Sequence, residues 1–466
     1  MKSNLHLKNC QIFTPIDTVK YMLDQIGYTE NIFGKKILDL SCGDGNFLVE
    51  AADRFIKEGI EKGKSTKEII DTLSKSLYGY EVDSKYVRLC KQKLDQLALR
   101  YSLGTVDWKI FHEDGLDSSE NNKFDFIFGN PPYISYFDLD IETRKKVKAE
   151  FISCQKGKFD YSYAFIEKGL RLLGEHGNMI YITPSNMFKT TFGYNLRELI
   201  KPELTQIIDC ANCKIFDKVT ISPSITLYRK GNKSDLILYK ELLSNEEKII
   251  EKKLLSNKWD FTGYQENGTR SFGDLFRASS SVATLANGVF IHTCDNNKPC
   301  VDVEKNILRT AKSPKSERYG LKQKIIFPYA YKAGKLIRYD EVEFNVKFPK
   351  TVLFLQNHRD QLEKRDADSS AKWFEFGRSQ ALAHLNQEKL LISSIITKKV
   401  VVYKLGRKEI PYSGIYIVPR ENTTTLDSAE TILNSESFLN YLFSKGVKLN
   451  GSSIRISSRD IEEFKY

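Results

Sequence analysis

Residues 37–47 of the chain are ILDLSCGDGNF, an apolar run followed by a turn with two glycines and the start of a helical pattern. Gly43 and Gly45 allow the backbone to turn tightly and to approach a bound molecule closely. The third glycine of a dinucleotide fingerprint is missing, because the corresponding position is Leu48. The stretch therefore predicts a strand, a ligand-binding turn and a helix, and it argues against a pyrophosphate ligand.

Apolar, strand-like runs alternate with helical patterns through the first half of the chain. This alternation predicts an α/β fold with a doubly wound, mostly parallel sheet, whose ligands bind at the carboxyl ends of the strands. The strands are expected at 36–40, 77–81, 108–112, 124–129, 178–183, 206–210 and 224–229.

Acidic residues end three successive predicted strands, at Asp39, Glu81 and Asp114. A positively charged sulfonium cofactor has no phosphates and favours nearby carboxylates, which Asp39 and Asp44 supply. Glu81 could accept hydrogen bonds from both ribose hydroxyls, and Asp114 could accept one from an adenine amino group. The alternative is a buried turn acid at Asp39 and helix caps at the other two positions.

Residues 124–134, FDFIFGNPPYI, are an apolar strand that leads directly into Asn-Pro-Pro-Tyr. Consecutive prolines fix φ and remove two N–H donors, so the loop presents carbonyl acceptors in a stiff arrangement. The Asn130 side chain and the Pro131 carbonyl could hold both hydrogens of an exocyclic amine, while Pro132 stiffens the loop and Tyr133 adds an aromatic face. These acceptors would concentrate the nitrogen lone pair towards a methyl donor. A proline-rich loop without chemistry is the alternative.

The order of these motifs resembles the amino-group methyltransferases of DNA, specifically the γ-type N6-adenine class of restriction–modification systems. The resemblance implies a Rossmann-like fold that uses S-adenosyl-L-methionine to methylate N6 of a flipped-out adenine at a specific site in double-stranded DNA. It implies catalytic roles for Asn130, Pro131, Pro132 and Tyr133, and stacking of Phe216 on the target base. We expect the ring of Tyr133 to stack on this base as well. By the same resemblance, the cofactor would contact Thr14, Asp39, Ser41, Gly43, Glu81 and Asp114.

One residue departs from the pattern of this class. Gly115 stands where an apolar or aromatic residue often follows the adenine-binding acid, so the resemblance gives no ring for cofactor stacking at this position.

The composition changes near residue 233, which predicts three parts of the chain. We expect a catalytic domain over 1–233, a charged helical linker over 234–260 and an α+β target-recognition domain over 261–466. The formal net charge of +11 suggests an acidic partner, and basic residues alternate with aromatic ones after position 308. A solvated basic surface is the alternative. The residues expected to contact DNA are Arg309, Lys312, Lys315, Arg318, Lys322, Lys324 and Arg378.

Other features of the sequence narrow the class of protein. Cys210 and Cys213 form a single CxxC pair without a matching second pair, so we expect no metal site. No apolar run is long enough for a membrane span, and we expect a cytoplasmic monomer. A cognate restriction endonuclease would be a separate protein.

Two other functions fit parts of the sequence. The same chemistry could act on an RNA base or a protein glutamine, although such relatives seldom carry a basic second domain of this size. A non-catalytic DNA-binding specificity protein is the other alternative, and the intact acids and tetrapeptide argue against it. N4-cytosine methylation is disfavoured because that group more often has serine or aspartate in place of Asn130.

Overall fold

A computed structural model gives the structure of the chain, which divides into two compact units. One unit is Met1–Phe261 with Val447–Gly451, and the other is Thr262–Gly446 with Ser452–Tyr466. The structure describes residues 12–210, 213, 215–216, 222–244, 246–264, 266, 268–294, 301–421, 424–449 and 453–466.

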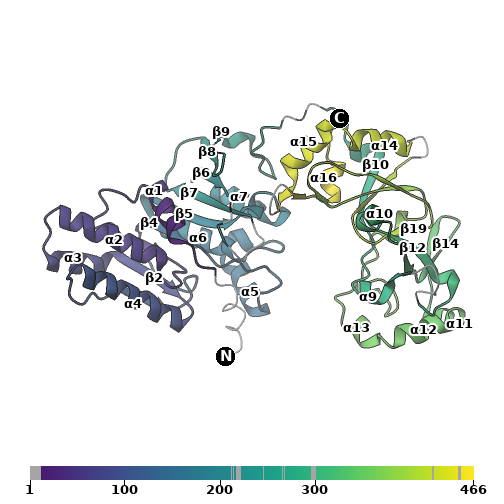
Figure 1. Cartoon of the computed structure of the whole chain (residues 1–466), viewed down its shortest axis with the longest axis horizontal. Helices are drawn as coiled ribbons and strands as arrows, with labels where there is room; N and C mark the ends of the chain where they lie inside the picture. Colours follow the sequence, from purple (N-terminus) through teal and green to yellow (C-terminus); the bar gives the residue numbers. More distant parts are fainter. Residues whose placement is uncertain are drawn as a thin grey trace. The chain divides into compact units, whose positions relative to one another are not determined.

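The first unit is built on a nine-stranded sheet with the order β3-β2-β1-β4-β5-β7-β6-β8-β9 (Figure 1). Strands β7 and β9 are antiparallel to their neighbours, and the other neighbouring pairs are parallel. The strands are β1 (Ile37–Asp39), β2 (Leu77–Glu81), β3 (Lys109–His112), β4 (Phe124–Gly129), β5 (Leu173–Pro184), β6 (Leu204–Asp209), β7 (Pro223–Arg229), β8 (Leu236–Glu241) and β9 (Glu247–Glu251). The seven expected strands are all present, and the expected fold class is confirmed.

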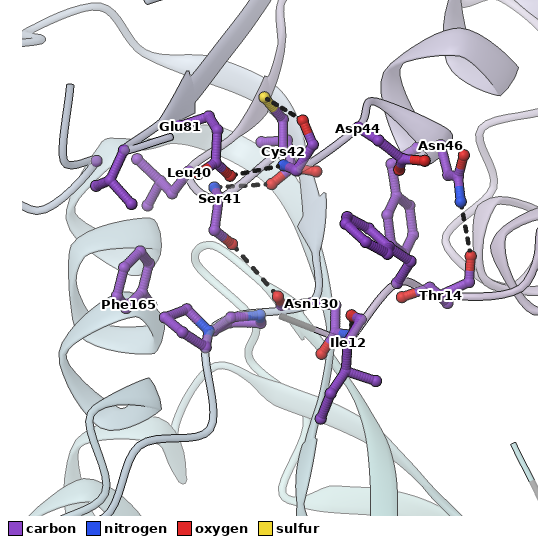
Figure 2. A pocket seen from close by; sticks show the side chains of 18 of the residues that line it. Ile12, Thr14, Leu40, Ser41, Cys42, Asp44, Asn46, Glu81, Asn130 and Phe165 are labelled. Atoms are coloured by element: carbon purple, nitrogen blue, oxygen red, sulfur yellow. Dashed lines mark hydrogen bonds between the residues drawn. The ribbon is translucent and has the colours of Figure 1, made fainter. Parts of the chain in front are cut away.

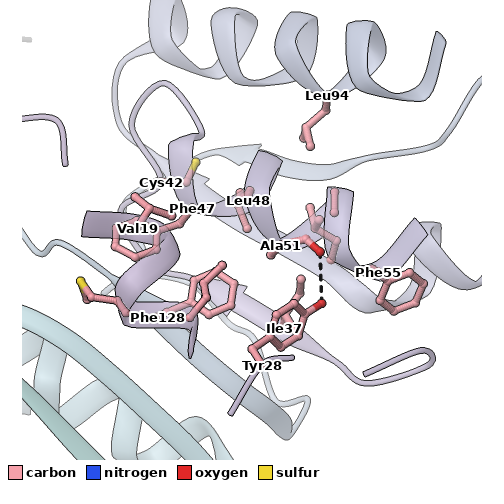
Figure 3. Close-up of a cluster of buried hydrophobic side chains, with 14 of the residues drawn as sticks. Val19, Tyr28, Ile37, Cys42, Phe47, Leu48, Ala51, Phe55, Leu94 and Phe128 are labelled. Atoms are coloured by element: carbon pink, nitrogen blue, oxygen red, sulfur yellow. Dashed lines mark hydrogen bonds between the residues drawn. The ribbon is translucent and has the colours of Figure 1, made fainter. Parts of the chain in front are cut away.

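Helices cover both faces of this sheet and bury its central strands on both sides. The first core joins the strands to α1 (Ile16–Gln25), α2 (Asn46–Glu61), α3 (Thr66–Ser76) and α4 (Ser84–Arg100). Figure 3 shows this core, where Phe47 stacks on Phe128 with ring centroids 5.8 Å apart. The second core joins the opposite face to α5 (Ile141–Glu150), α6 (Ser162–Leu172) and α7 (Tyr194–Ile200).

The expected helical linker over 234–260 is wrong. Strands β8 and β9 occupy most of this segment and extend the sheet from β6. Ile237 and Tyr239 of β8 are buried, and the Tyr239 hydroxyl donates a 2.6 Å hydrogen bond to Asp209. A boundary near residue 233 would therefore cut two strands from the sheet.

The second unit is α+β, as its composition suggests. One four-stranded sheet has the order β10-β20-β16-β18 and another has the order β11-β13-β12-β19. These strands are β10 (Phe276–Ser280), β11 (Ile291–Thr293), β12 (Leu308–Lys312), β13 (Gln323–Ile326), β16 (Lys389–Ile392), β18 (Tyr403–Leu405), β19 (Glu409–Pro411) and β20 (Ile415–Pro419).

Smaller elements complete this unit. β14 (Tyr329–Lys332) and β15 (Lys335–Arg338) form a hairpin, and β17 (Ile395–Ile396) pairs with β22 (Ile454–Arg455). The helices are α8 (Phe272–Leu275), α9 (Asn287–Phe290), α10 (Pro314–Tyr319), α11 (Glu341–Lys347), α12 (Pro349–Gln356), α13 (Arg359–Glu363), α14 (Leu426–Leu433), α15 (Glu436–Lys445) and α16 (Ser458–Glu462). No described helix of either unit is both long and apolar enough to cross a membrane.

Candidate active site

A pocket of about 880 Å³, part of it open to solvent, lies at the carboxyl ends of β1, β2 and β4 (Figure 2). Every residue that we expected to bind the cofactor lines it, and so does the whole Asn-Pro-Pro-Tyr tetrapeptide. Asp44, the other carboxylate expected near the cofactor, also lines the pocket. Further lining residues, which were not predicted as site residues, are Ile12, Phe13, Asn46, Phe47, Glu113, Tyr161 and Phe165. The structure thus brings the predicted residues of five separate segments to one cavity.

The turn after β1 forms one wall of the pocket. Gly43 and Gly45 have φ values of +54° and +89°, a region that favours glycine. A Cβ on Gly45 would lie 2.6 Å from the Cys90 sulfur, so this position has no space for a side chain. The Gly43 amide donates a 3.0 Å hydrogen bond to Glu81. The loop is therefore tied directly to the end of the next strand.

Glu81 is buried at the end of β2, with 7% of its surface exposed. Its carboxylate accepts hydrogen bonds from the amides of Gly43 at 3.0 Å and Asp83 at 2.8 Å. Burial raises the pKa of Glu81, while these amide hydrogen bonds act in the opposite direction. A buried carboxylate at this strand end can accept the hydroxyls of a ribose.

We expect Glu81→Ala to weaken cofactor binding at least tenfold, because hydrogen bonds to a charged group contribute about 1.5–3 kcal/mol. Calorimetric titration of the cofactor measures this effect, and a DNA titration of the same variant serves as the control. An unchanged cofactor affinity would remove Glu81 from the binding site.

Asp39 is fully buried at the end of β1, and its carboxylate accepts a 2.9 Å hydrogen bond from the Ser41 amide. Burial raises the pKa of Asp39 to about 7, and the nearby Glu81 carboxylate acts in the same direction. The Asp39 carboxyl therefore loses its proton near neutral pH, and only its ionised form attracts a cation.

This pKa predicts how cofactor affinity depends on pH. A positively charged cofactor should bind about tenfold more weakly at pH 6 than at pH 8, because most Asp39 carboxyls are protonated below pH 7. S-adenosylhomocysteine, whose sulfur is neutral, should show a smaller change. Asn at position 39 keeps an acceptor for the Ser41 amide without the charge, so Asp39→Asn should flatten the profile. Identical profiles for the two ligands would contradict this role.

Asp114 is held by a residue that the sequence did not identify. The Tyr161 hydroxyl donates a 3.0 Å hydrogen bond to one Asp114 oxygen, and the Leu116 amide donates to the other at 3.0 Å. Tyr161 is buried and packs edge-on against Phe165, with ring centroids 5.4 Å apart. These two rings give the pocket aromatic walls that Gly115 cannot supply.

A short strap, residues 12–15, closes the pocket on the side of the β1 turn (Figure 2). The Asn46 side chain donates a 3.1 Å hydrogen bond to the Thr14 carbonyl. The Thr14 hydroxyl is buried and makes no hydrogen bond within the described part of the chain. An unpaired buried hydroxyl is costly unless a ligand satisfies it, which supports a contact between Thr14 and a bound molecule.

Asn130 is oriented by the same strap. Its side-chain amide donates a 2.9 Å hydrogen bond to the Ile12 carbonyl. Its Oδ1 is buried and has no partner among the described residues, so it remains an unused acceptor in the wall of the pocket. The Ser41 hydroxyl donates to the Asn130 carbonyl at 3.4 Å, which links the tetrapeptide to the β1 turn.

Tyr133, the last residue of the tetrapeptide, packs against Phe216. The Tyr133 hydroxyl donates a 3.0 Å hydrogen bond to the Ile182 carbonyl of β5, which fixes the position of the ring. Phe216 packs edge-on against Tyr133, with centroids 6.4 Å apart and planes at 77°. Tyr133 lines the pocket and Phe216 lies behind it, and each has 9% of its surface exposed.

The residues predicted to contact DNA all lie in the second unit, and they fall into two groups. Lys315, Arg318 and Lys322 are exposed around α10. The other four are partly buried. Lys312 pairs with Glu317 and Glu409, Arg378 pairs with Asp366 and Asp368, Lys324 donates to the Thr310 hydroxyl, and Arg309 donates to the carbonyls of Asn306 and Leu308. Among the described residues, no cluster of three or more His, Cys, Asp or Glu side chains could hold a metal ion.

Comparison with known proteins identifies the catalytic half. Residues 36–216, which contain the β1 turn, all three strand-end acids and the tetrapeptide, match the Eco57I restriction-modification methylase family. The chain is a DNA methyltransferase similar to the modification enzymes of restriction–modification systems. The pocket has the features that a positively charged sulfonium cofactor requires, namely buried acids, a glycine turn and the unpaired Thr14 hydroxyl.

Named relatives agree with this assignment. The methylase is 24% identical to the type II methyltransferase M.BstVI of Geobacillus stearothermophilus, over 97% of this chain and 89% of the relative. It is also 24% identical to the type II restriction enzyme and methyltransferase RM.Eco57I of Escherichia coli, of which it spans half the length. The fold resembles the DNA-bound restriction–modification enzyme MmeI, with a TM-score of 0.65 at 14% identity over 96% of this chain and 65% of MmeI.

Proposed function

We propose that this methylase transfers a methyl group to N6 of a flipped-out adenine at a specific site in double-stranded DNA. The observation that carries the proposal is the orientation of Asn130. Its amide nitrogen donates to the Ile12 carbonyl, and its buried Oδ1 has no partner among the described residues, so this lining residue keeps a free acceptor. An exocyclic amine supplies the two hydrogens that this oxygen and the neighbouring Pro131 carbonyl could accept.

Each group of pocket residues has a separate role in the proposed methyl transfer. S-adenosylmethionine, when bound, supplies an electrophilic methyl group on a positively charged sulfur. Asn130 and Pro131 would hold the amine and direct its lone pair, and Pro132 keeps the loop stiff. Tyr133 would stack on the extruded base, with Phe216 supporting its ring. Thr14, Ser41, Gly43, Glu81 and Asp114 would hold the cofactor, and Asp39 would balance its charge.

The second unit is proposed to select the DNA site. Its exposed Lys315, Arg318 and Lys322 would contact phosphates, because cations next to a duplex release condensed counterions. Arg309, Lys312, Lys324 and Arg378 could bind DNA only by exchanging the partners that they have within the protein. We further propose that a cognate endonuclease is a separate protein, because the methylase spans most of M.BstVI, which is named as a methyltransferase alone. We also propose that the methylase acts as a monomer.

Transfer of a labelled methyl group from S-adenosylmethionine to duplex DNA, RNA and protein substrates tests this proposal. We expect label in DNA alone, at a limited number of sites. Label in RNA or protein without label in DNA would contradict the proposal.

A further inference from the structure

The chain that leaves the tetrapeptide forms the rim of the pocket. Ser135 makes an antiparallel bridge with Asp160, and the Tyr161 amide donates a 3.0 Å hydrogen bond to the Ile134 carbonyl. Tyr133 and Tyr161, which line the pocket, thus stand at the base of two adjacent segments, 134–137 and 156–160. Side chains on these segments are therefore next in the chain to residues that line the pocket.

Exposed aromatic and basic side chains share this rim. Phe137 and Phe192 have 62% and 42% of their surfaces exposed, and Lys156 and Lys158 are exposed beside them. The Lys158 ammonium lies 4.4 Å from the centroid of the Phe137 ring, a cation–π contact. We call Phe137, Lys156, Lys158 and Phe192 the rim surface.

The turn that carries the two lysines has a fixed shape. Gly157, between them, has a φ of +72°, which favours glycine. A Cβ at this position would overlap the Phe192 ring, so the ring packs directly on the glycine backbone. Lys156 and Lys158 are therefore presented from a turn that is braced by Phe192.

Neighbouring charges leave the rim surface basic. On α5, Arg144 and Lys148 lie 4.7 Å and 5.0 Å from the Tyr136 ring centroid. Asp138 accepts a hydrogen bond from the Ser135 hydroxyl, and Asp140 caps α5 by accepting one from the Thr143 amide. Lys156 and Lys158 have flanking aromatic faces and form no ion pair with an acid among the described residues, which suits an anionic polymer better than an apolar protein partner.

We propose that the rim surface binds phosphates of the DNA strand beside the flipped adenine. This inference rests on the proposed function and adds a DNA contact within the catalytic unit. Phe137 follows Tyr133 by four residues and lies at most about 14 Å away along the chain. That distance corresponds to about four nucleotide steps. The rim surface is therefore within reach of a duplex that delivers its base to Tyr133.

The test is DNA binding by the double variant Lys156→Ala/Lys158→Ala across a range of NaCl concentrations. The matched control is Lys67→Ala/Lys75→Ala, which removes the same charge from two exposed lysines of α3. Loss of two phosphate contacts should make the slope of log K against log salt less negative by about 1.8. We expect this change both for a duplex with the target site and for an unrelated duplex. The control should keep the wild-type slope, and both variants should bind cofactor normally.

A second variant separates stacking from charge. Phe137→Ala should weaken binding of both duplexes several-fold at an unchanged salt slope, because it keeps both charges but removes the ring that positions the Lys158 ammonium. Equal slopes for the lysine variant and its control would overturn the inference, and so would a loss confined to the duplex with the target site. Failure of the wild-type protein to bind DNA would instead contradict the proposed function.

Discussion

Asn130→Ala should reduce methyl transfer roughly 10²–10³-fold and leave cofactor affinity nearly unchanged. The variant removes the buried Oδ1 that has no partner within the described chain, and it also releases the Ile12 carbonyl. Loss of one preorganised polar group at a reaction centre has an effect of this size. Single-turnover methylation of a duplex with the target site measures it, with 2-aminopurine fluorescence at the target position as a report of base flipping. Flipping should persist.

The aspartate variant distinguishes acceptor chemistry from shape. Asn130→Asp keeps a side-chain oxygen in the same place but cannot donate to Ile12. We expect it to be slower than the wild type and at least tenfold faster than Asn130→Ala. Equal rates for the two variants would mean that the acceptor at this position does not contribute to transfer.

Tyr133→Ala is expected to lower both the transfer rate and the population of flipped base. Stacking of a base on an aromatic ring contributes about 1–3 kcal/mol, so the rate should fall by up to roughly a hundredfold. The variant also removes the edge-on contact with Phe216. The 2-aminopurine signal with cofactor present, measured beside the rate, checks both effects.

Tyr133→Phe is the matched control for this prediction. It keeps the ring and loses only the hydroxyl that donates to the Ile182 carbonyl, a hydrogen bond that contributes about 1 kcal/mol to stability. It should therefore flip the base and methylate at close to the wild-type rate. If Tyr133→Ala left signal and rate untouched, Tyr133 would be a structural residue.

The sequence predicts well the features that local patterns encode. The apolar strands and the glycine turn are local, and the parallel order of the sheet places Asp39, Glu81, Asp114 and Asn130 at one edge. Contacts between distant residues leave no such pattern. Tyr161 binds Asp114 across 47 positions and Ile12 binds Asn130 across 118, so both needed the structure.

The incorrect prediction of a helical linker over residues 234–260 has a physical explanation. Strand β9 is the edge strand of the sheet and β8 is next to it, and charged side chains at an edge discourage pairing with other molecules. Lys240, Glu247 and Lys248 therefore give these strands the composition of an exposed helix. The predicted DNA contacts were also based on charge alone. The sequence did not show that Lys312 and Arg378 have acidic partners within the protein.

Nucleoside analysis decides whether this methylase modifies adenine at N6. Duplex DNA is incubated with the purified protein and isotopically labelled S-adenosylmethionine, digested to nucleosides and resolved by mass spectrometry. The orientation of Asn130 and the packing of Tyr133 against Phe216 predict that labelled N6-methyladenine is the product and that Asn130→Ala forms little of it. Labelled N4-methylcytosine without N6-methyladenine, or no labelled base at all, would contradict adenine methylation by this protein.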